Sequence, residues 1–341
     1  MKPEDELQAT IANVIEPGKG ILAADESVPT ITKRLKAVGI DSTEESRRAY
    51  RSLLITTAGA ERFLSGVILF EETLGQSADD GTPLPQVLAR RGIMPGIKVD
   101  KGTTALVGAP GDLITQGLDG LSERMTAFKA QGMRFAKWRE VYAITDHNPT
   151  WLGIEANAEV LARYAAICQA EGIVPIVEPE VLIDGEHSIE RCFAVTENVL
   201  HAVFHALRRH QVALEYMVLK PNMVLPGKEH RPKATPETVA AATLKVLRRT
   251  VPAAVPSINF LSGGQSPEEA TANLNAINLL YPQAPWVLSF SYARALQDPV
   301  MPLWAGRPEN VPAAQKAFAK RIEMNSLARH GRWKPELERA A

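Results

Sequence analysis

Eight short apolar runs, each followed by a helical pattern, most constrain how this 341-residue chain can fold. Short apolar runs bounded by charged or turn-forming residues predict buried strands, and longer patterns with helical periodicity predict helices between them. No Gly/Ser-rich linker, shift in composition or sequence repeat divides the chain. The predicted strands are Gly20–Asp25, Gly66–Phe70, Gly96–Asp100, Phe135–Arg139, Val174–Glu178, Tyr216–Lys220, Ile258–Leu261 and Val287–Ser291.

This alternation predicts an α/β protein of the (β/α)₈ or TIM-barrel type, with a doubly wound open sheet as the alternative. We expect one domain over residues 1–341, with the barrel at approximately 18–306 and a C-terminal helix and tail at 307–341. Additional helices are expected at 4–15 and 308–329. Ser42 with Glu45, and Ser266 with Glu269, predict capping boxes at two helix starts.

Composition excludes several classes of protein. Lys plus Arg number 38 and Asp plus Glu 39, so this near-neutral chain lacks the excess positive charge of nonspecific nucleic-acid binders. Cys168 and Cys192 form neither a metal-binding spacing nor a disulfide framework, which is typical of a reducing compartment. The uncharged stretch 270–293 is interrupted by prolines and asparagines, and the N-terminus lacks an apolar signal core. We therefore expect a cytoplasmic protein without a membrane segment.

Charged residues gather at the carboxyl ends of the predicted strands, where barrel enzymes place their active sites. Residues two apart on a strand share a face, so many of these side chains point the same way. Such a ring is costly unless its members pair with one another and with a ligand, and a purely structural ring of ion pairs is the alternative. The ring comprises Asp25, Lys98, Asp100, Lys137, Arg139, Glu178, Glu180 and Lys220.

Lys220 follows a buried strand, and Pro221 ends the strand's hydrogen bonding. Partial desolvation favours the neutral amine, which can attack a carbonyl and form a Schiff base. Lys137 would strengthen this effect as a second ammonium, while Glu178 and Glu180 could shuttle protons. Asp25 could accept a proton from a substrate hydroxyl. The alternative for Lys220 alone is a lysine that extends to solvent from a strand end.

Two regions predict phosphate binding. The seventh unit ends in Leu261-Ser-Gly-Gly-Gln265, where glycines let backbone N–H groups approach an anion, and the eighth supplies Arg294. Lys33 and Arg34 follow the first strand, and Lys98 ends the third. Two separate phosphate sites would suit a substrate phosphorylated at both ends. The alternative for Lys33 and Arg34 is a solvated helix face.

Three other motifs lack the surrounding sequence features that their functions require. Leu261-Ser-Gly-Gly-Gln265 matches the signature of ABC-type ATPases, but the chain has no P-loop. Gly18-Lys-Gly-Ile-Leu-Ala23 precedes a strand instead of following one, which excludes a dinucleotide fingerprint. His201 and His205 lack the intervening glutamate and a third ligand. We therefore expect no nucleotide cofactor and no metal.

The chain resembles the class I fructose-bisphosphate aldolases, the metal-independent Schiff-base type. The resemblance spans nearly the whole length in family order. It is carried by GKGILAADES (18–27), GIKVDKG (96–102), FAKWR (135–139), VPIVEPE (174–180), VLKPNM (218–223), FLSGGQS (260–266) and SYARALQ (291–297).

This resemblance implies a role for each candidate residue. Lys220 is similar to the Schiff-base lysine, Glu178 to the acid/base of dehydration with Glu180 beside it, and Lys137 to the supporting lysine. Asp25 resembles the carboxylate that takes the C4-hydroxyl proton. Arg139 shares a face with Lys137. The C1-phosphate site would comprise Ser262, Gly263, Gly264, Ser291 and Arg294, and the other end of the sugar would lie near Ser27, Lys33, Arg34 and Lys98.

The implied activity is reversible cleavage of fructose 1,6-bisphosphate to dihydroxyacetone phosphate and glyceraldehyde 3-phosphate in glycolysis or gluconeogenesis, without a cofactor. The family also implies a homo-oligomer, usually a tetramer. The alternatives are another phosphorylated ketose, such as sedoheptulose 1,7-bisphosphate or fructose 1-phosphate, and a non-catalytic scaffold. The chain departs from the family at Ala293, where relatives have glycine, at Val28-Pro29-Thr30, and in its tail, which lacks a terminal tyrosine.

Overall fold

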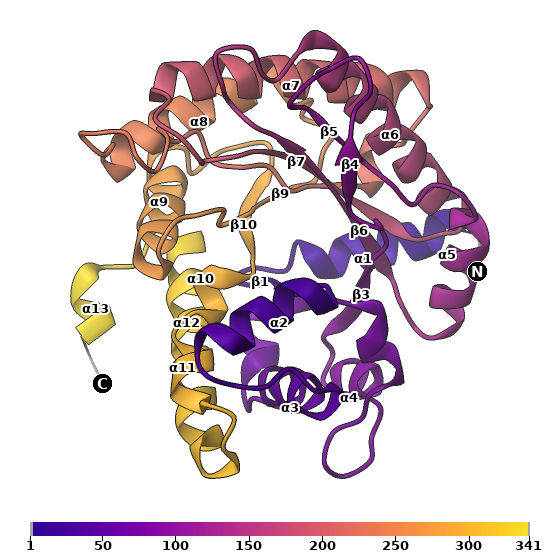
Figure 1. Ribbon diagram of the computed structural model, residues 1–341, viewed down its shortest axis with the longest axis vertical. Helices are drawn as coiled ribbons and strands as arrows, with labels where there is room; N and C mark the ends of the chain where they lie inside the picture. The colour runs from indigo at the N-terminus through magenta and orange to yellow at the C-terminus, as the bar shows by residue number, and fades with distance from the viewer. Residues whose placement is uncertain (1–2, 340–341) are drawn as a thin grey trace.

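A computed structural model describes residues 3–339 and contains a closed barrel of eight parallel strands (Figure 1). Each barrel strand pairs with its neighbours in chain order, and the first pairs with the last. The (β/α)₈ prediction is confirmed and the open doubly wound sheet is wrong, because β1 and β10 close the ring. The barrel strands are β1 (Gly20–Ala24), β2 (Leu64–Leu69), β3 (Met94–Lys98), β6 (Phe135–Tyr142), β7 (Val174–Val181), β8 (Val218–Leu219), β9 (Ser257–Phe260) and β10 (Val287–Tyr292).

Helices surround this barrel (Figure 1). Their apolar faces and the outward-facing residues of the strands form the larger hydrophobic core. The α-helices are α1 (Pro3–Val14), α2 (Val28–Ala37), α3 (Glu44–Ile55), α4 (Leu84–Arg90), α5 (Leu121–Ala130), α6 (Trp151–Ala170), α7 (Ile189–Arg209), α8 (Pro236–Thr250), α9 (Pro267–Leu280), α10 (Arg294–Gln297), α11 (Val300–Trp304), α12 (Val311–Arg329) and α13 (Pro335–Arg339). Short 3₁₀ turns are η1 (Ala60–Arg62), η2 (Glu71–Gly75), η3 (Leu214–Tyr216) and η4 (Pro308–Asn310).

The N-terminal helix α1 packs on the inward-facing apolar residues of the barrel. Leu7, Ile11 and Val14 form its buried stripe and join a cluster with Ile21 and Phe135. In Figure 1 this helix runs beside the start of β1, at the amino end of the strands. The helix therefore closes the end of the barrel opposite the strands' carboxyl ends.

Phe135 fills the lumen at this amino end. A Cβ placed on Gly96 would lie 2.1 Å from its ring, and one placed on Gly66 would lie 2.8 Å from it. Such close approaches leave no room for any side chain larger than hydrogen. The two glycines on β2 and β3 therefore make the space that the aromatic ring of β6 occupies.

The structure differs locally from the sequence-based expectations. The sixth barrel strand spans only Val218–Leu219, because the run that begins at Tyr216 starts with a 3₁₀ turn. A two-stranded antiparallel hairpin, β4 (Thr103–Ala105) and β5 (Leu113–Thr115), was missed, since each strand has only three residues and most of them are exposed.

One of the two predicted capping boxes is present in the structure. The Ser266–Glu269 capping box at the start of α9 is confirmed. The prediction for Ser42 with Glu45 is wrong, because Thr43 caps α3 and the reciprocal bond comes from Ser46, one residue later. Within residues 3–339, no helix is both long and apolar enough to cross a bilayer.

Candidate active site

A cavity of about 520 Å³ opens at the carboxyl ends of the barrel strands. Candidate residues from distant parts of the sequence line it together, as the parallel barrel requires. These lining residues are Asp25, Ser27, Lys33, Arg34, Lys98, Lys137, Arg139, Glu178, Glu180, Lys220, Ser262, Gly263, Ser291 and Arg294. Gly264 is the exception among the candidates, since it lines two adjoining pockets behind the loop.

Strand register places the central groups at similar heights in the barrel. Lys98 of β3 lies opposite Lys137 of β6, and Arg139 lies opposite Glu178 of β7. Lys220 directly follows β8, and its backbone N–H still donates to the carbonyl of Val177 at 2.8 Å. The side chains therefore project from rigid backbone, which fixes their mutual positions.

Two lysines and two carboxylates form the buried centre of this cavity, which we call the central quartet: Asp25, Lys137, Glu178 and Lys220. Lys137 Nζ lies 2.7 Å from Asp25 Oδ2 and 3.2 Å from Glu178 Oε2. Lys220 Nζ lies 3.1 Å from Glu178 Oε1. Each residue in the quartet is at most 7% exposed, so water screens these charges very little.

The two lysines differ in their partners. Burial acts to lower the pKa of Lys137, but the carboxylates of Asp25 and Glu178 outweigh it and raise that pKa above the ordinary value. Lys137 therefore stays protonated between two acids. Lys220 contacts one carboxylate, and it shares that carboxylate with Lys137. Within the described residues, Lys137 therefore pairs with two carboxylates and Lys220 with one.

The acids of the quartet also differ. Burial acts to raise the pKa of Asp25, but the ammonium groups of Lys137 and Lys220 overcome it and lower the pKa to about 2. Asp25 is thus an ionised proton acceptor at neutral pH. Glu178 lies between the two amines, although its Oε2 makes no hydrogen bond within the described residues and meets Lys137 only as an ion pair.

Arg139 and Lys98 flank the quartet on either side. Arg139 Nε donates to Glu180 Oε2 at 2.6 Å, so Glu180 is neutralised by a different cation from those of the quartet. Lys98 Nζ donates to the Asp100 carboxylate and to its backbone carbonyl. The predicted sharing of faces within Lys98–Asp100 agrees with this contact.

The loop after β9 has the features of an anion cradle. Gly263 has a positive φ of 56°, a conformation that favours glycine. Within residues 3–339, the backbone N–H groups of Ser262, Gly263 and Gly264 donate to no protein acceptor. Arg294 lies beside this loop and donates to the carbonyl of Gly263. The Ser291 hydroxyl is buried and lacks a partner among the described residues, although it lines the cavity.

Another part of the cavity wall carries Lys33 and Arg34 on α2. Arg34 donates to the carboxylate of Glu26 and lies 3.2 Å from Asp298 Oδ1, so its charge is already largely neutralised. Lys33 is exposed on the same helix. Ser27 shares a hydrogen bond of 3.0 Å with Thr30. This wall is therefore less cationic than the sequence alone indicates.

Sequence reasoning missed several residues of this site. Glu26 sits between two candidates, but strand periodicity assigns it to the opposite face, so only its pairing with Arg34 shows its place. Asp298 has no local signal, because 264 residues separate it from Arg34. Ala293 departs from the family glycine, yet its φ is −101°, so the position needs no glycine for backbone reasons.

Metal-binding geometry is a separate question from these ion pairs. Across residues 3–339, no group of three or more His, Cys, Asp or Glu side chains is arranged to hold a metal ion. The cavity is lined by four lysine amines and several carboxylates, and two of these amines belong to the central quartet. This is an arrangement for proton transfer and amine chemistry.

Comparison with known proteins agrees with this geometry. The family model "Fructose-bisphosphate aldolase class-I" matches residues 6–341. The chain is 56% identical to the cytosolic fructose-bisphosphate aldolase 6 of Arabidopsis thaliana, over 97% of this chain and 92% of that one. It is 53% identical to the non-muscle fructose-bisphosphate aldolase of Lethenteron camtschaticum, over 97% and 91%.

A solved structure is similar over almost the full length. Fructose-bisphosphate aldolase from Plasmodium falciparum, crystallised with TRAP and a small-molecule inhibitor, superposes with a TM-score of 0.96. It is 50% identical, with 98% of this chain and 96% of that chain covered. The chain therefore belongs to the class I fructose-bisphosphate aldolase family, whose members cleave fructose 1,6-bisphosphate through a lysine Schiff base and use no cofactor.

Proposed function

We propose that Lys220 is the nucleophile of this aldolase reaction. Its neutral amine adds to the C2 ketone of fructose 1,6-bisphosphate, and loss of water from the carbinolamine gives an iminium. The iminium accepts the electron pair of the C3–C4 bond, so glyceraldehyde 3-phosphate leaves and an enamine remains. Protonation at C3 and hydrolysis then release dihydroxyacetone phosphate and restore the amine.

The other members of the central quartet divide the proton transfers. Glu178 contacts Lys220 through one oxygen and Lys137 through the other, which suits it to move protons during carbinolamine dehydration. Asp25 stays ionised and accepts the proton of the C4 hydroxyl as the bond breaks. Lys137 keeps its charge and balances both carboxylates throughout the cycle. Glu180, held by Arg139, supports the same end of the cavity.

The two phosphates of the substrate occupy opposite walls. The C1 phosphate binds the free N–H groups of the Ser262–Gly264 loop, with Ser291 and Arg294 beside it. The other phosphate lies near Ser27, Lys33, Arg34 and Lys98. The partial neutralisation of Arg34 by Glu26 and Asp298 makes this second wall the weaker anion site.

The observation that carries the assignment is the unequal pairing of the two buried lysines. Lys220→Met should lower kcat at least about 10⁴-fold and abolish the adduct that borohydride forms with dihydroxyacetone phosphate. Lys137→Met is the matched control, because it removes the other buried amine. It should lower kcat by about 10²–10³-fold and still form the adduct. An adduct that survives in Lys220→Met but disappears in Lys137→Met would reverse the assignment.

We also propose that the protein is a cytoplasmic homo-oligomer. An apolar patch on the surface supports self-association: Val107 is 93% exposed, Trp151 62% and Leu152 48%. The two parts of this patch adjoin, since Asp112 of the hairpin bonds Thr150 at the start of α6. Light scattering should give a mass above that of one chain, and Trp151→Glu with Leu152→Glu should reduce it. A wild-type mass equal to that of one chain would contradict this proposal.

A further inference from the structure

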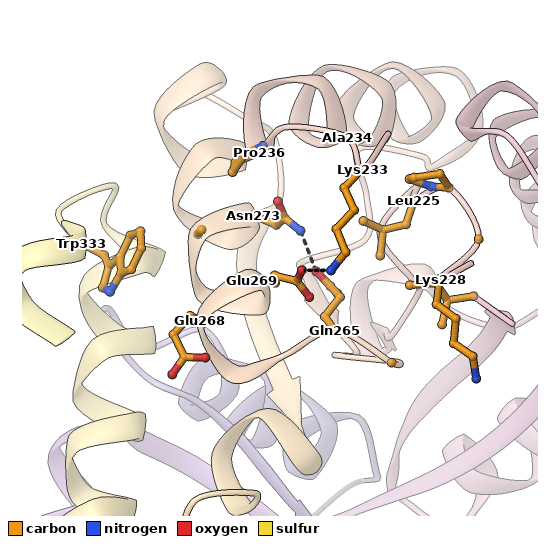
Figure 2. A pocket seen from close by; sticks show the side chains of 15 residues that line it. Leu225, Lys228, Lys233, Ala234, Pro236, Gln265, Glu268, Glu269, Asn273 and Trp333 are labelled. Atoms are coloured by element: carbon orange, nitrogen blue, oxygen red, sulfur yellow. Dashed lines mark hydrogen bonds and ion pairs between the residues drawn. The ribbon is translucent and has the colours of Figure 1, made fainter. Parts of the chain in front are cut away.

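Two buried amides lie directly behind the phosphate-binding loop. Gln265 ends the loop and is 6% exposed, and Asn273 lies on α9 and is 5% exposed. Figure 2 shows the two side chains pointing toward each other, with Asn273 Nδ2 donating to Gln265 Oε1 at 2.7 Å. Gln265 Nε2 in turn donates to the backbone carbonyl of Ser262 at 3.0 Å. The pair therefore links a helix to the loop through two consecutive hydrogen bonds.

The direction of both bonds follows from simple chemistry. A backbone carbonyl can only accept, so the nitrogen of the Gln265 amide must face Ser262. The Gln265 oxygen is then left for Asn273, which must offer its own nitrogen. The Ser262 carbonyl thus sets which way the Gln265 amide points, and Asn273 stabilises that orientation by donating to the Gln265 oxygen. A side chain at position 273 that could only accept would favour a rotated Gln265 amide. The Gln265 oxygen would then face the Ser262 carbonyl oxygen, and the two would repel each other.

Gln265 also stands between two cavities. Ser262 and Gly263 line the active site, whereas Gln265, Gly264 and Asn273 line a separate pocket of about 310 Å³ (Figure 2). The exposed ion pair of Lys233 with Glu269 lies beside the amide pair in Figure 2, and within residues 3–339 neither of its side chains bonds the Ser262 carbonyl. The amide pair is consequently the side-chain connection between α9 and the loop whose N–H groups face the substrate.

We propose that Gln265, oriented by Asn273, is a positioning residue for phosphate binding. By holding the Ser262 carbonyl, it sets the direction of the following N–H groups at Gly263 and Gly264. Its loss should weaken binding of the C1 phosphate while leaving the quartet and the bond-breaking step intact. This inference rests on the proposed assignment of the Ser262–Gly264 loop to that phosphate.

Two near-isosteric variants test it without opening a large cavity. Gln265→Met removes the side-chain donor to the Ser262 carbonyl and leaves the backbone N–H of residue 265, which donates to the same carbonyl at 3.2 Å. Asn273→Asp keeps Gln265 but removes the donor to its amide oxygen. Both should raise the KM for fructose 1,6-bisphosphate about three- to tenfold, with kcat changed less than twofold. Asn278→Asp is the matched control, because Asn278 lies on the same helix and bonds only the carbonyl of Leu274. It should leave both constants near wild-type values.

Hydride trapping separates phosphate binding from general damage. The concentration of dihydroxyacetone phosphate that gives half-maximal borohydride adduct should rise three- to tenfold in both variants, as the KM does. Trapping with dihydroxyacetone, which has the ketone but no phosphate, should match the control variant. An equal loss with both ketones, or an unchanged KM in both variants, would overturn the role of Gln265. If the wild type formed no adduct with either ketone, the proposed Schiff-base site itself would fail.

Discussion

The two ends of the barrel lumen are built on different physical principles. At the amino end, the ring of Phe135 fills space left by Gly66 and Gly96, and α1 covers it. At the carboxyl end, the central quartet fills the lumen with two positive and two negative groups. The first end is stabilised by close packing, and the second is tolerated because each buried charge has a partner.

Substitutions at the two ends should therefore have different consequences. A misfit at the amino end changes the free energy of unfolding, since many van der Waals contacts depend on volume. A changed charge at the carboxyl end alters the protonation of its neighbours and therefore the chemistry. The comparison predicts that stability and turnover respond to different substitutions along the same strands.

Among the substitutions that test this comparison between the two ends, Asp25→Asn has the largest expected effect. Asp25→Asn keeps the shape of the side chain but removes a carboxylate 2.7 Å from Lys137, so no base remains for the substrate hydroxyl. We expect kcat to fall by about 10²–10⁴-fold. Steady-state cleavage assays measure this. Asp184→Asn, at an exposed carboxylate paired with Lys228, is the control and should keep wild-type activity. A kcat within threefold of wild type for Asp25→Asn would break the comparison.

The next effect is at Gly96, at the other end of the lumen. Gly96→Ala places a methyl group 2.1 Å from the Phe135 ring, so it should lower the free energy of unfolding by about 1–3 kcal/mol. Its kcat should stay within about twofold of wild type. Urea unfolding measures the change. Gly75→Ala is the control, because a Cβ there meets no atom within 4 Å. A loss of turnover without loss of stability would contradict the division between the two ends.

The smallest expected effect concerns Glu140 on β6, which belongs neither to the packing at the amino end nor to the central quartet. Its side chain is fully buried, and its Oε1 accepts from Trp138 Nε1 at 2.7 Å. Burial raises the pKa of Glu140 to about 8. Between the unfolded and folded pKa values the native state holds a proton that the unfolded chain has lost. The contribution of Glu140 to the free energy of unfolding therefore decreases as the pH rises toward 8.

Glu140→Gln removes this titration and keeps an oxygen for Trp138. Its stability relative to wild type should increase by about 1 kcal/mol between pH 7 and pH 8. Urea unfolding at both pH values gives the difference directly. A constant difference between variant and wild type would show that Glu140 does not titrate in this range.

Much of the fold was predictable because strand and helix periodicities differ strongly. The apolar runs ending at Asp25, Lys98 and Lys220 located both the strands and the end of the barrel that carries the site. Strand alternation likewise indicated that Lys137 and Arg139 would share the cavity. These are local patterns, and a closed parallel barrel gathers them at one face.

The rest depends on contacts that no local pattern encodes. Arg34 is neutralised by Asp298, and Gln265 is oriented by Asn273 across a helix start, so only the folded chain reveals either pairing. The hairpin at 103–115 was missed because strands of three residues are too short to show a hydrophobic alternation. The N-cap of α3 lies one residue after the predicted position, because Ser and Thr are both good N-caps and only the backbone path selects between them.

Peptide mass mapping of the wild-type protein tests the role of Lys220 most directly. The protein is incubated with dihydroxyacetone phosphate and borohydride in the presence of EDTA, then digested. We predict a single reduced adduct, located on Lys220, and cleavage activity that is unaffected by EDTA. An adduct located on Lys137, or full turnover with no adduct on any lysine, would contradict the unequal roles of the two buried amines.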